Sequence, residues 1–373
     1  MANDGASLWL YRALAGVPRL NYRGKIMLIA FIGTHIPLLA LMGYFVTHAS
    51  SDWDYTVWVL SVALGATLFG TGVTLFVLHH LLRPIELTSQ SLRQYMTNGH
   101  LPRLPGQYTD EAGMLMADTA FTLNKLDQTL QQLVSELRIA SQIQLAMLPK
   151  PRYAHASVQL AAALQPAKVV GGDLYDYFVL DSRRLLVAVG DVSDKGVPAA
   201  LFMARTCALL KLVVQQTQEP SELLARLNQE LTTNNDLCMF VTFFCAILHL
   251  DTGELCCASA GHDAALIMRG GQPLQFDDSL SGPALGLHND AEFPAWRTCL
   301  QPGDSLLLYT DGITEAFNTE GEAFTLERLQ AVLSTMPHQR APGALIDDLL
   351  TRVHAFVDTA EPSDDITVLA LTY

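Results

Sequence analysis

Two long apolar stretches open the pattern of hydrophobic and polar residues along this chain. They cover residues 26–46 and 57–78, and neither contains Asp, Glu, Lys or Arg. Each is long enough to cross a hydrocarbon layer of about 30 Å as an α-helix. The pattern therefore predicts two transmembrane helices within residues 26–82, joined by a short external loop at residues 48–56.

Charged residues beside these stretches predict their orientation. Basic residues lie before the first stretch and after the second, whereas the loop between them carries only Asp52 and Asp54. Positively charged flanks remain in the cytoplasm. We therefore expect a cytoplasmic N-terminal segment (residues 1–25), a multi-pass anchor in the cytoplasmic membrane, and a cytoplasmic C-terminal part. The basic flanking residues are Arg12, Arg19, Arg23, Lys25 and Arg83.

His35 lies near the middle of the first stretch, two residues before Pro37. An ionisable group at that depth is a candidate for a sensing function. We favour the alternative, a neutral histidine bonded to a neighbouring turn of its own helix.

Apolar residues at alternating spacings of three and four follow the second stretch. Ile85, Leu92 and Met96 fit one stripe, and a Pro- and Gly-rich connector covers residues 98–108. A longer stripe then continues until Pro149. Because such a seam requires a partner helix, we predict a coiled-coil signalling helix at residues 123–149 and a parallel homodimer. The members of the longer stripe are Leu123, Leu126, Leu130, Leu133, Leu137, Ala140, Gln144 and Met147.

Pro84 lies at the start of the first stripe, and the DExG sequence at residues 110–113 follows the connector. With helices on either side, they make residues 79–131 resemble the HAMP relay domain of bacterial receptors. The resemblance implies that helices from two subunits pack as a parallel four-helix bundle. A plain juxtamembrane coiled coil is the alternative.

From about residue 152 the pattern changes to short β-type runs separated by helical segments. Strands are predicted near residues 157–164, 175–180, 184–190, 241–249, 254–260, 264–269, 304–310 and 366–372. Helices are predicted near residues 197–216, 220–234, 325–335 and 343–358. These strands and helices do not alternate regularly, so they predict an α+β layered fold for residues 150–373.

The composition is typical of a membrane anchor joined to an acidic domain. Hydrophobic residues make up 50% of the 373 residues, and the net charge is −14. Residues 1–105 hold seven Lys and Arg against four Asp and Glu, so the rest of the chain holds 16 against 33. An acidic C-terminal part argues against nucleic-acid binding. The six cysteines form no CxxC pair, and we interpret them as reduced and mostly buried.

Four acidic clusters lie next to predicted strand ends. Aspartates at strand ends can converge on one point, and several like charges there are tolerable only around cations. All-oxygen ligation favours Mg²⁺ or Mn²⁺. Taken singly, each cluster is explained more readily by an Asp-Gly turn or a helix cap. The clusters are VGGDLYD (170–176), VGDVSDKG (189–196), YTDGITEA (309–316) and SDDIT (363–367).

The series GGDxYD, GDVSxKG, AGH, TDGxxEA and DDIT is similar to that of the metal-dependent protein phosphatase 2C superfamily. The motif sequences resemble those of its bacterial branch, named after the stage II sporulation E phosphatase, over residues 138–373. The resemblance implies a β-sandwich of two antiparallel sheets flanked by helices, with metal ions in a cleft at one edge. It also implies hydrolysis of phosphoserine or phosphothreonine on a protein by a water that two metal ions activate.

The resemblance also assigns roles to single positions. Asp191 would bridge two divalent cations, Mn²⁺ or Mg²⁺, and the backbone carbonyl of Val192 would bind one of them. No protein nucleophile is needed for such a reaction. The other candidate ligands are Asp173 for the second ion, and Asp311, Asp364 and, less directly, Asp365 for the first. The candidate catalytic residues are Asp173, Asp191, Asp311 and Asp364.

Three residues near these motifs have two interpretations each. Asp194 stands where the family more often has glycine, and we favour an exposed loop carboxylate over a further metal contact. Lys195 is interpreted either as a phosphate-steering group or as a solvated loop lysine. His262 matches the histidine of AGH, and we favour a structural hydrogen-bonding role for it.

Together these features predict a membrane-anchored, signal-regulated protein serine/threonine phosphatase. In the related phosphatases the usual substrate is a phosphorylated anti-sigma-factor antagonist, a STAS-domain protein. The resemblance therefore implies the same class of partner here. The main alternative is a non-catalytic membrane signalling scaffold built on a phosphatase fold. A transport role is the weaker alternative, because two helices per subunit line no obvious pathway.

Overall fold

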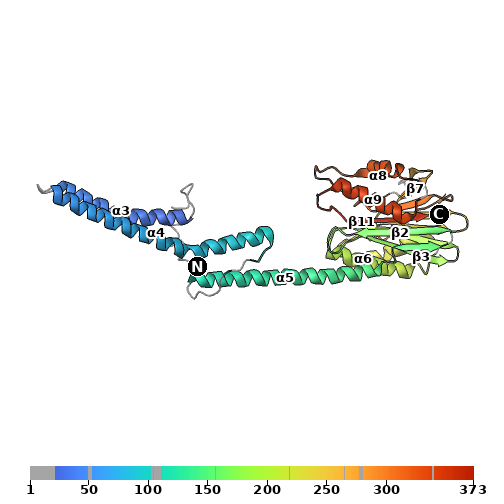
Figure 1. Cartoon of the computed structure of the whole chain (residues 1–373). Coiled ribbons are helices and arrows are strands. Elements are labelled where there is room, and N and C mark those ends of the chain that lie inside the picture. Colours follow the sequence, from blue (N-terminus) through green and yellow to red (C-terminus); the bar gives the residue numbers. More distant parts are fainter. Residues whose placement is uncertain are drawn as a thin grey trace. The chain divides into compact units, whose positions relative to one another are not determined.

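The computed structural model describes residues 22–48, 53–101, 104, 111–155, 157–217, 219–263, 265–276, 280–337 and 340–373. The chain divides into two compact units, Met1–Gln131 and Gln132–Tyr373. Figure 1 shows the helices and strands of both units. Most of the predicted N-terminal segment, part of the predicted external loop and most of the predicted connector lie outside the described residues.

Two long helices of the first unit carry the apolar stretches. Helix α3 (Tyr22–His48) contains a candidate span at Ile26–Tyr44 with a mean hydropathy of 2.1. Helix α4 (Trp53–Asn98) contains a second span with a mean hydropathy of 1.8. Only 6% of each apolar window is buried within the protein. The two predicted apolar helices are therefore present, and their orientation in a membrane stays a prediction.

Helix α4 continues beyond its apolar stretch as far as Asn98, with Pro84 inside it. The hydroxyl of Thr88 donates a hydrogen bond to the carbonyl of Pro84 at 2.8 Å. Asp110 of the DExG sequence lies outside the described residues. The relay bundle thus stays a prediction.

His35 is bonded within its own helix. Its Nδ1 atom lies 2.8 Å from the carbonyl oxygen of Phe31, one turn earlier in α3. Next to it, the hydroxyl of Thr71 on α4 donates to the hydroxyl of Thr34 at 3.0 Å. This local bonding agrees with the structural interpretation of His35.

Helix α5 (Glu111–Met147) ends two residues before Pro149, where the sequence predicts its end. Several apolar side chains along it are about half exposed. An exposed apolar stripe favours a partner helix, and the parallel dimer stays a prediction. These side chains are Leu126 at 47%, Leu130 at 47%, Leu133 at 51%, Ile139 at 56% and Ile143 at 62% exposure.

Two antiparallel sheets form the second unit. Their strand orders are β1-β2-β11-β10-β7-β8 and β3-β4-β5-β6-β9. The six-stranded sheet contains β1 (Arg152–His155), β2 (Val158–Gln165), β7 (Leu266–Arg269), β8 (Gln272–Gln275), β10 (Ser305–Tyr309) and β11 (Ile366–Thr372). The five-stranded sheet contains β3 (Leu174–Asp181), β4 (Arg184–Val192), β5 (Val241–His249), β6 (Glu254–Ala260) and β9 (Ala295–Cys299).

A pair of helices covers the outer face of each sheet (Figure 1). Helices α6 (Val197–Val213) and α7 (Pro220–Thr232) pack on the five-stranded sheet. Helices α8 (Thr325–Ser334) and α9 (Pro342–Val357) pack on the six-stranded sheet. Between the sheets, buried side chains such as Val187, Phe244 and Leu369 form a third cluster. This four-layer sandwich is the predicted α+β fold.

The sequence pattern missed three strands, β1, β8 and β9. Their sequences are RYAH, QPLQ and AWRTC, which are short and carry polar or exposed residues. All three are edge strands. Edge strands of sheets are often short and polar, because this discourages pairing with other chains, so they lack the apolar alternation that reveals a half-buried strand.

Candidate active site

Four aspartates come together at one edge of the sandwich. Asp173 precedes β3 and Asp191 lies near the end of the adjacent antiparallel strand β4. In the other sheet, Asp311 follows β10 and Asp364 precedes the adjacent antiparallel strand β11. Antiparallel pairing places the end of one strand beside the start of the next, so each sheet delivers two aspartates. These four residues are called the acidic centre.

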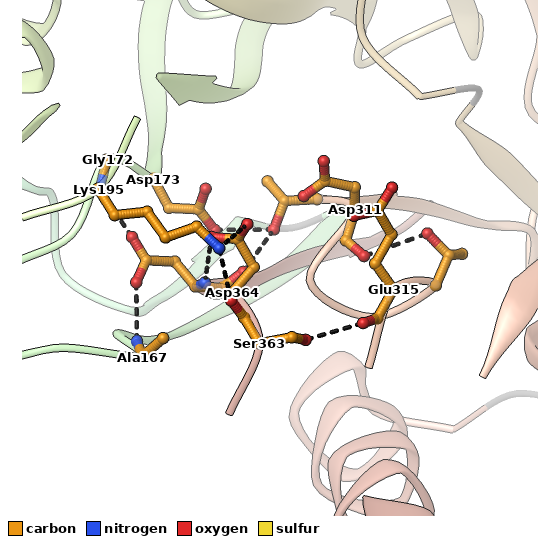
Figure 2. A network of polar contacts seen from close by, with 11 residues as sticks. Ala167, Gly172, Asp173, Lys195, Asp311, Glu315, Ser363 and Asp364 are labelled. Atoms are coloured by element: carbon orange, nitrogen blue, oxygen red, sulfur yellow. Dashed lines mark hydrogen bonds and ion pairs between the residues drawn. The ribbon is translucent and has the colours of Figure 1, made fainter. Parts of the chain in front are cut away.

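The carboxylate of Asp365 is hydrogen-bonded to backbone groups beside the acidic centre. Its Oδ1 accepts a hydrogen bond from the backbone N–H of Ala167 and its Oδ2 accepts one from Gly172, each at 2.7 Å (Figure 2). A second bond between the sheets runs from the hydroxyl of Thr310 to Oδ2 of Asp173, at 2.7 Å. Asp365 is thus bonded to the backbone of the loop before β3, whereas Asp364 accepts hydrogen bonds from Lys195 and from the backbone N–H of Asp365.

Glycines allow these loops to approach one another. A Cβ atom at Gly171 or Gly312 would overlap Asp365, and one at Gly172 would lie 2.9 Å from the carbonyl oxygen of Val192. Real Cβ atoms do not come that close to other heavy atoms. The glycines next to Asp173 and Asp311 are thus required by packing, and the carbonyl of Val192 faces the loop that carries Asp173.

Burial and mutual repulsion raise the pKa values within the acidic centre. Burial, followed by the charge of Asp311, raises the pKa of Asp191 to about 7. Burial, followed by the charge of Glu315, raises the pKa of Asp311 to about 6. Burial and the charge of Asp191 also raise the pKa of Asp173 well above its usual value. The site therefore resists holding all its negative charges without a compensating cation.

The donor set of the acidic centre suits hard divalent cations. Oδ1 of Asp311 is buried and has no hydrogen-bond partner among the described residues, although a buried carboxylate oxygen normally has one. Carboxylate and carbonyl oxygens are the ligands that Mg²⁺ and Mn²⁺ prefer. Within the described part of the chain, no three acidic, His or Cys side chains already form a closed metal cage. Small side-chain rotations would thus have to accompany cation binding.

Lys195 supplies a positive charge at the edge of the acidic centre. Its Nζ lies 2.6 Å from Oδ2 of Asp364 and donates to the carbonyl of Ser363 at 2.5 Å (Figure 2). The side chain is exposed in its loop, and its ammonium group is at the same time paired with Asp364, so both interpretations stay open. The ammonium group offsets part of the charge of Asp364.

His262 joins the two sheets beside the acidic centre. Its Nε2 is 3.0 Å from the carbonyl oxygen of Tyr309 on β10, and its Nδ1 is 2.9 Å from the hydroxyl of Thr242 on β5. A carbonyl can only accept, so Nε2 carries the proton. Burial lowers the pKa of His262 to about 4. The structural interpretation of this neutral histidine is confirmed.

Asp194 occupies a backbone conformation that explains the glycine usual in the family. Its φ angle is +65°, in the left-handed region that glycine adopts without strain and that aspartate tolerates better than most residues. Its side chain is exposed. The interpretation as an exposed loop carboxylate is confirmed.

Two further carboxylates surround the acidic centre and were not assigned from the sequence. The charges of Glu315 and Asp263 both act on Asp311. Each lies inside or beside a motif that the sequence displays, TDGITEA and AGHD. The motifs could therefore have indicated these two carboxylates, but the sequence does not show where their side chains lie.

Gln144 links helix α5 to the loop that carries Asp173. Its Nε2 donates to the carbonyl of Gly171 at 2.5 Å, and its Oε1 accepts from the N–H of Gly171 at 3.3 Å. The side chain is only 8% exposed. The sequence pattern predicts Gln144 in an apolar helix seam, whereas its amide group binds the domain that follows.

Two more hydrogen bonds fix the end of α5. The ammonium group of Lys211 on α6 donates to the carbonyl of Met147 at 2.6 Å, which satisfies an otherwise unpaired oxygen at the helix end. The hydroxyl of Tyr175 on β3 donates to the carbonyl of Pro149 at 3.1 Å. The end of α5 and the residues after it are therefore held by α6 and by β3, the strand that begins directly after Asp173.

Comparison with protein families gives a match between residues 181–373 and the model of stage II sporulation protein E (SpoIIE). Among curated proteins, Protein IcfG of Synechocystis is 27% identical over 79% of this chain and 52% of its own length. The phosphoserine phosphatase RsbU of Bacillus subtilis is 31% identical over 51% of this chain and 57% of its own length. The chain thus spans about half the length of these curated relatives.

Solved structures with a similar fold include the PP2C domain of SiaA from Pseudomonas aeruginosa. It is 20% identical, with a TM-score of 0.58 over 66% of this chain and 98% of that one. The phosphatase domain of SpoIIE from Bacillus subtilis, with a fragment of its regulatory domain, is 20% identical. Its TM-score is 0.52 over 60% of this chain and 64% of that one. Both comparisons support the phosphatase 2C fold.

Replacing Gln144 should loosen the loop of Asp173. We expect Gln144→Ala to lower the free energy of unfolding of the second unit by about 1–2 kcal/mol, because it leaves buried polar groups of Gly171 unpaired. It should also weaken Mn²⁺ binding, measured by calorimetry. Gln142→Ala, at an exposed position of the same helix, is the matched control. Equal Mn²⁺ affinity and stability in the two variants would contradict this role.

Stability of the metal-free protein should fall as the pH rises. The folded-state pKa values of Asp191 and Asp311 are raised to about 7 and 6, so between pH 4 and 7 the folded protein binds more protons than the unfolded chain. Its free energy of unfolding should then decrease on the order of 2 kcal/mol from pH 5 to pH 7.5. Calorimetric melting of the detergent-solubilised chain with a chelator measures this.

Mn²⁺ provides the control for this pH dependence. It should raise the melting temperature more at pH 7.5 than at pH 5, because protons compete with the cation for the carboxylates. Asp191→Asn should flatten the pH dependence of the metal-free protein. A melting temperature that rises with pH in the metal-free wild type would show that repulsion among the carboxylates of the acidic centre does not destabilise the folded protein.

Proposed function

The chain belongs to the stage II sporulation protein E (SpoIIE) family, and on this premise we propose that it is a metal-dependent protein serine/threonine phosphatase. The observation that carries this proposal is the convergence of four aspartates from two sheets, with a buried oxygen of Asp311 left unbonded. All four carboxylates of the family motifs are present. This argues against the alternative of a non-catalytic scaffold, which would not need to retain them.

Asp191, Asp173, Asp311 and Asp364, with the carbonyl of Val192, would hold two divalent cations, Mn²⁺ or Mg²⁺. When bound, such ions supply an activated water nucleophile and neutralise charge on the phosphoryl group. The chain's own contribution is to hold these oxygens in place and to orient the substrate. Asp365 would act by fixing the loops through its two backbone bonds.

The remaining side chains favour a reaction without a protein nucleophile. Burial raises the pKa of the Cys207 thiol to about 12, so this cysteine is no thiolate near neutral pH. Both ring nitrogens of His262 are engaged in the bonds between the sheets. Lys195 is the cation best placed to attract an anionic phosphoryl group, because it already lies beside Asp364.

We further propose that the two apolar helices anchor the enzyme in the cytoplasmic membrane of a bacterium, with both termini in the cytoplasm. A HAMP-like relay and a parallel dimer of α5 would connect the membrane to the phosphatase domain. Gln144, near the end of α5, is hydrogen-bonded to Gly171 in the Asp173 loop. Lys211 and Tyr175 bind backbone carbonyls at the end of α5 and just after it. These hydrogen bonds support coupling between the helix and the Asp173 loop.

The proposed substrate is a phosphorylated anti-sigma-factor antagonist of the STAS class. Its support is the family membership and the similarity to RsbU and RsbP of Bacillus subtilis, both described as phosphoserine phosphatases. The acidic surroundings of the site agree with a protein substrate rather than a nucleic acid.

Asp191→Asn tests the proposed reaction. We expect the full chain in detergent with Mn²⁺ to release phosphate from phosphorylated STAS-domain proteins, and the variant to release it roughly 100-fold more slowly. The matched control is Asp194→Asn, three residues away in the same motif but exposed, which should retain the wild-type rate. A chelator should abolish release. Phosphate release by Asp191→Asn at the normal rate would remove Asp191 from the mechanism.

A further inference from the structure

A small pocket opens directly beside the acidic centre. Its volume is about 110 Å³, and it lies between the segment after β10, the end of α9 and the segment before β11. Phe317 contributes an aromatic wall and remains 42% exposed. The apolar lining residues are Pro166, Ala316, Phe317, Val357, Pro362 and Ile366.

Three polar side chains of the pocket wall, those of Gln165, His354 and Ser363, are bonded to one another or to backbone. Nε2 of His354 lies 2.8 Å from Oε1 of Gln165. The hydroxyl of Ser363 donates to the carbonyl of Glu315 at 2.8 Å. Because these groups already have partners, an apolar group entering the pocket would not leave them unsatisfied. The open surface of the pocket is therefore suited to an apolar ligand group.

The pocket is continuous with the acidic centre. Asp364 belongs to both, and Gly312 of the pocket wall directly follows Asp311. An extended peptide advances about 3.5 Å per residue. A phosphorylated residue placed at the acidic centre would therefore bring a side chain one or two residues away to the pocket mouth.

We propose that this pocket binds an aliphatic side chain of the protein substrate, one or two residues from the phosphorylated serine or threonine. The inference rests on the proposed function and names a sequence preference for it. A cavity of about 150 Å³ binds benzene, so a volume of 110 Å³ suits a branched aliphatic group. The carboxylate of Glu361 in the wall would repel an acidic residue.

Phosphopeptides test this preference. Each peptide carries one phosphoserine in an alanine background, with leucine placed in turn at each of the two positions on either side. The full chain in detergent with Mn²⁺ should hydrolyse one of these leucine peptides with about tenfold higher kcat/KM than the all-alanine peptide. Aspartate at that position should abolish the advantage, and lysine should not reproduce it.

Variants of the wall locate the preference in the pocket. Phe317→Ala removes one wall and Val357→Phe fills the space, and both should reduce the ratio of kcat/KM between the leucine and alanine peptides to about one. Leu274→Ala, at a 47% exposed position on edge strand β8, is the control and should keep the tenfold ratio. An unchanged ratio in Phe317→Ala and Val357→Phe, or no leucine preference in the wild type, would overturn the proposal.

A small substrate separates failure of this inference from failure of the proposed function. Absence of p-nitrophenyl phosphate and peptide hydrolysis by the wild type with Mn²⁺ would reject the phosphatase itself. Binding of fluorescent peptides, followed by anisotropy, then decides the pocket without turnover. The leucine peptide should bind about tenfold more tightly than the alanine peptide to the wild type, and equally to Phe317→Ala. Equal binding to the wild type would overturn the pocket assignment.

Discussion

Repulsion among the carboxylates of the acidic centre is the constraint that the loops of the second unit have to satisfy. The strands of the two sheets do not pair with each other, yet each sheet brings two aspartates to one edge of the sandwich. Burial there raises the pKa of Asp191 to about 7. The fold holds these charges together with bonds between the sheets, through Thr310, Asp365 and His262. Glycines allow the loops to approach closely enough for these bonds. A site held under such charge strain is prepared to bind cations.

The same loops connect the acidic centre to two other parts of the unit. On one side, Gln144 binds Gly171, so the position of α5 and the position of the Asp173 loop depend on each other. On the other side, Asp364 lies between Lys195 and the apolar pocket beside Phe317. A movement of α5 and the binding of a substrate would thus act on the same small set of loops.

Local sequence patterns predicted most of the strands and helices, because buried strands such as β4 and β5 are long apolar runs. They could not predict the short polar edge strands, which are defined by pairing rather than by burial. The motif order indicated which aspartates converge, since each stands at a strand end. The binding of Gln144 to Gly171, 27 residues apart, was not predictable, because a polar residue within an apolar stripe does not reveal its partner. The φ angle of Asp194 likewise depends on the folded loop.

We propose that the acidic centre would hold two divalent cations and that Asp191 would be a ligand of both. Diffraction from crystals grown with Mn²⁺, measured at the manganese absorption edge, tests this proposal most directly. We expect two anomalous peaks within bonding distance of Asp191, with Asp311 and Asp364 beside one and Asp173 nearer the other. Asp365 should keep its bonds to Ala167 and Gly172. Strong Mn²⁺ peaks elsewhere with none at Asp191 would contradict the account.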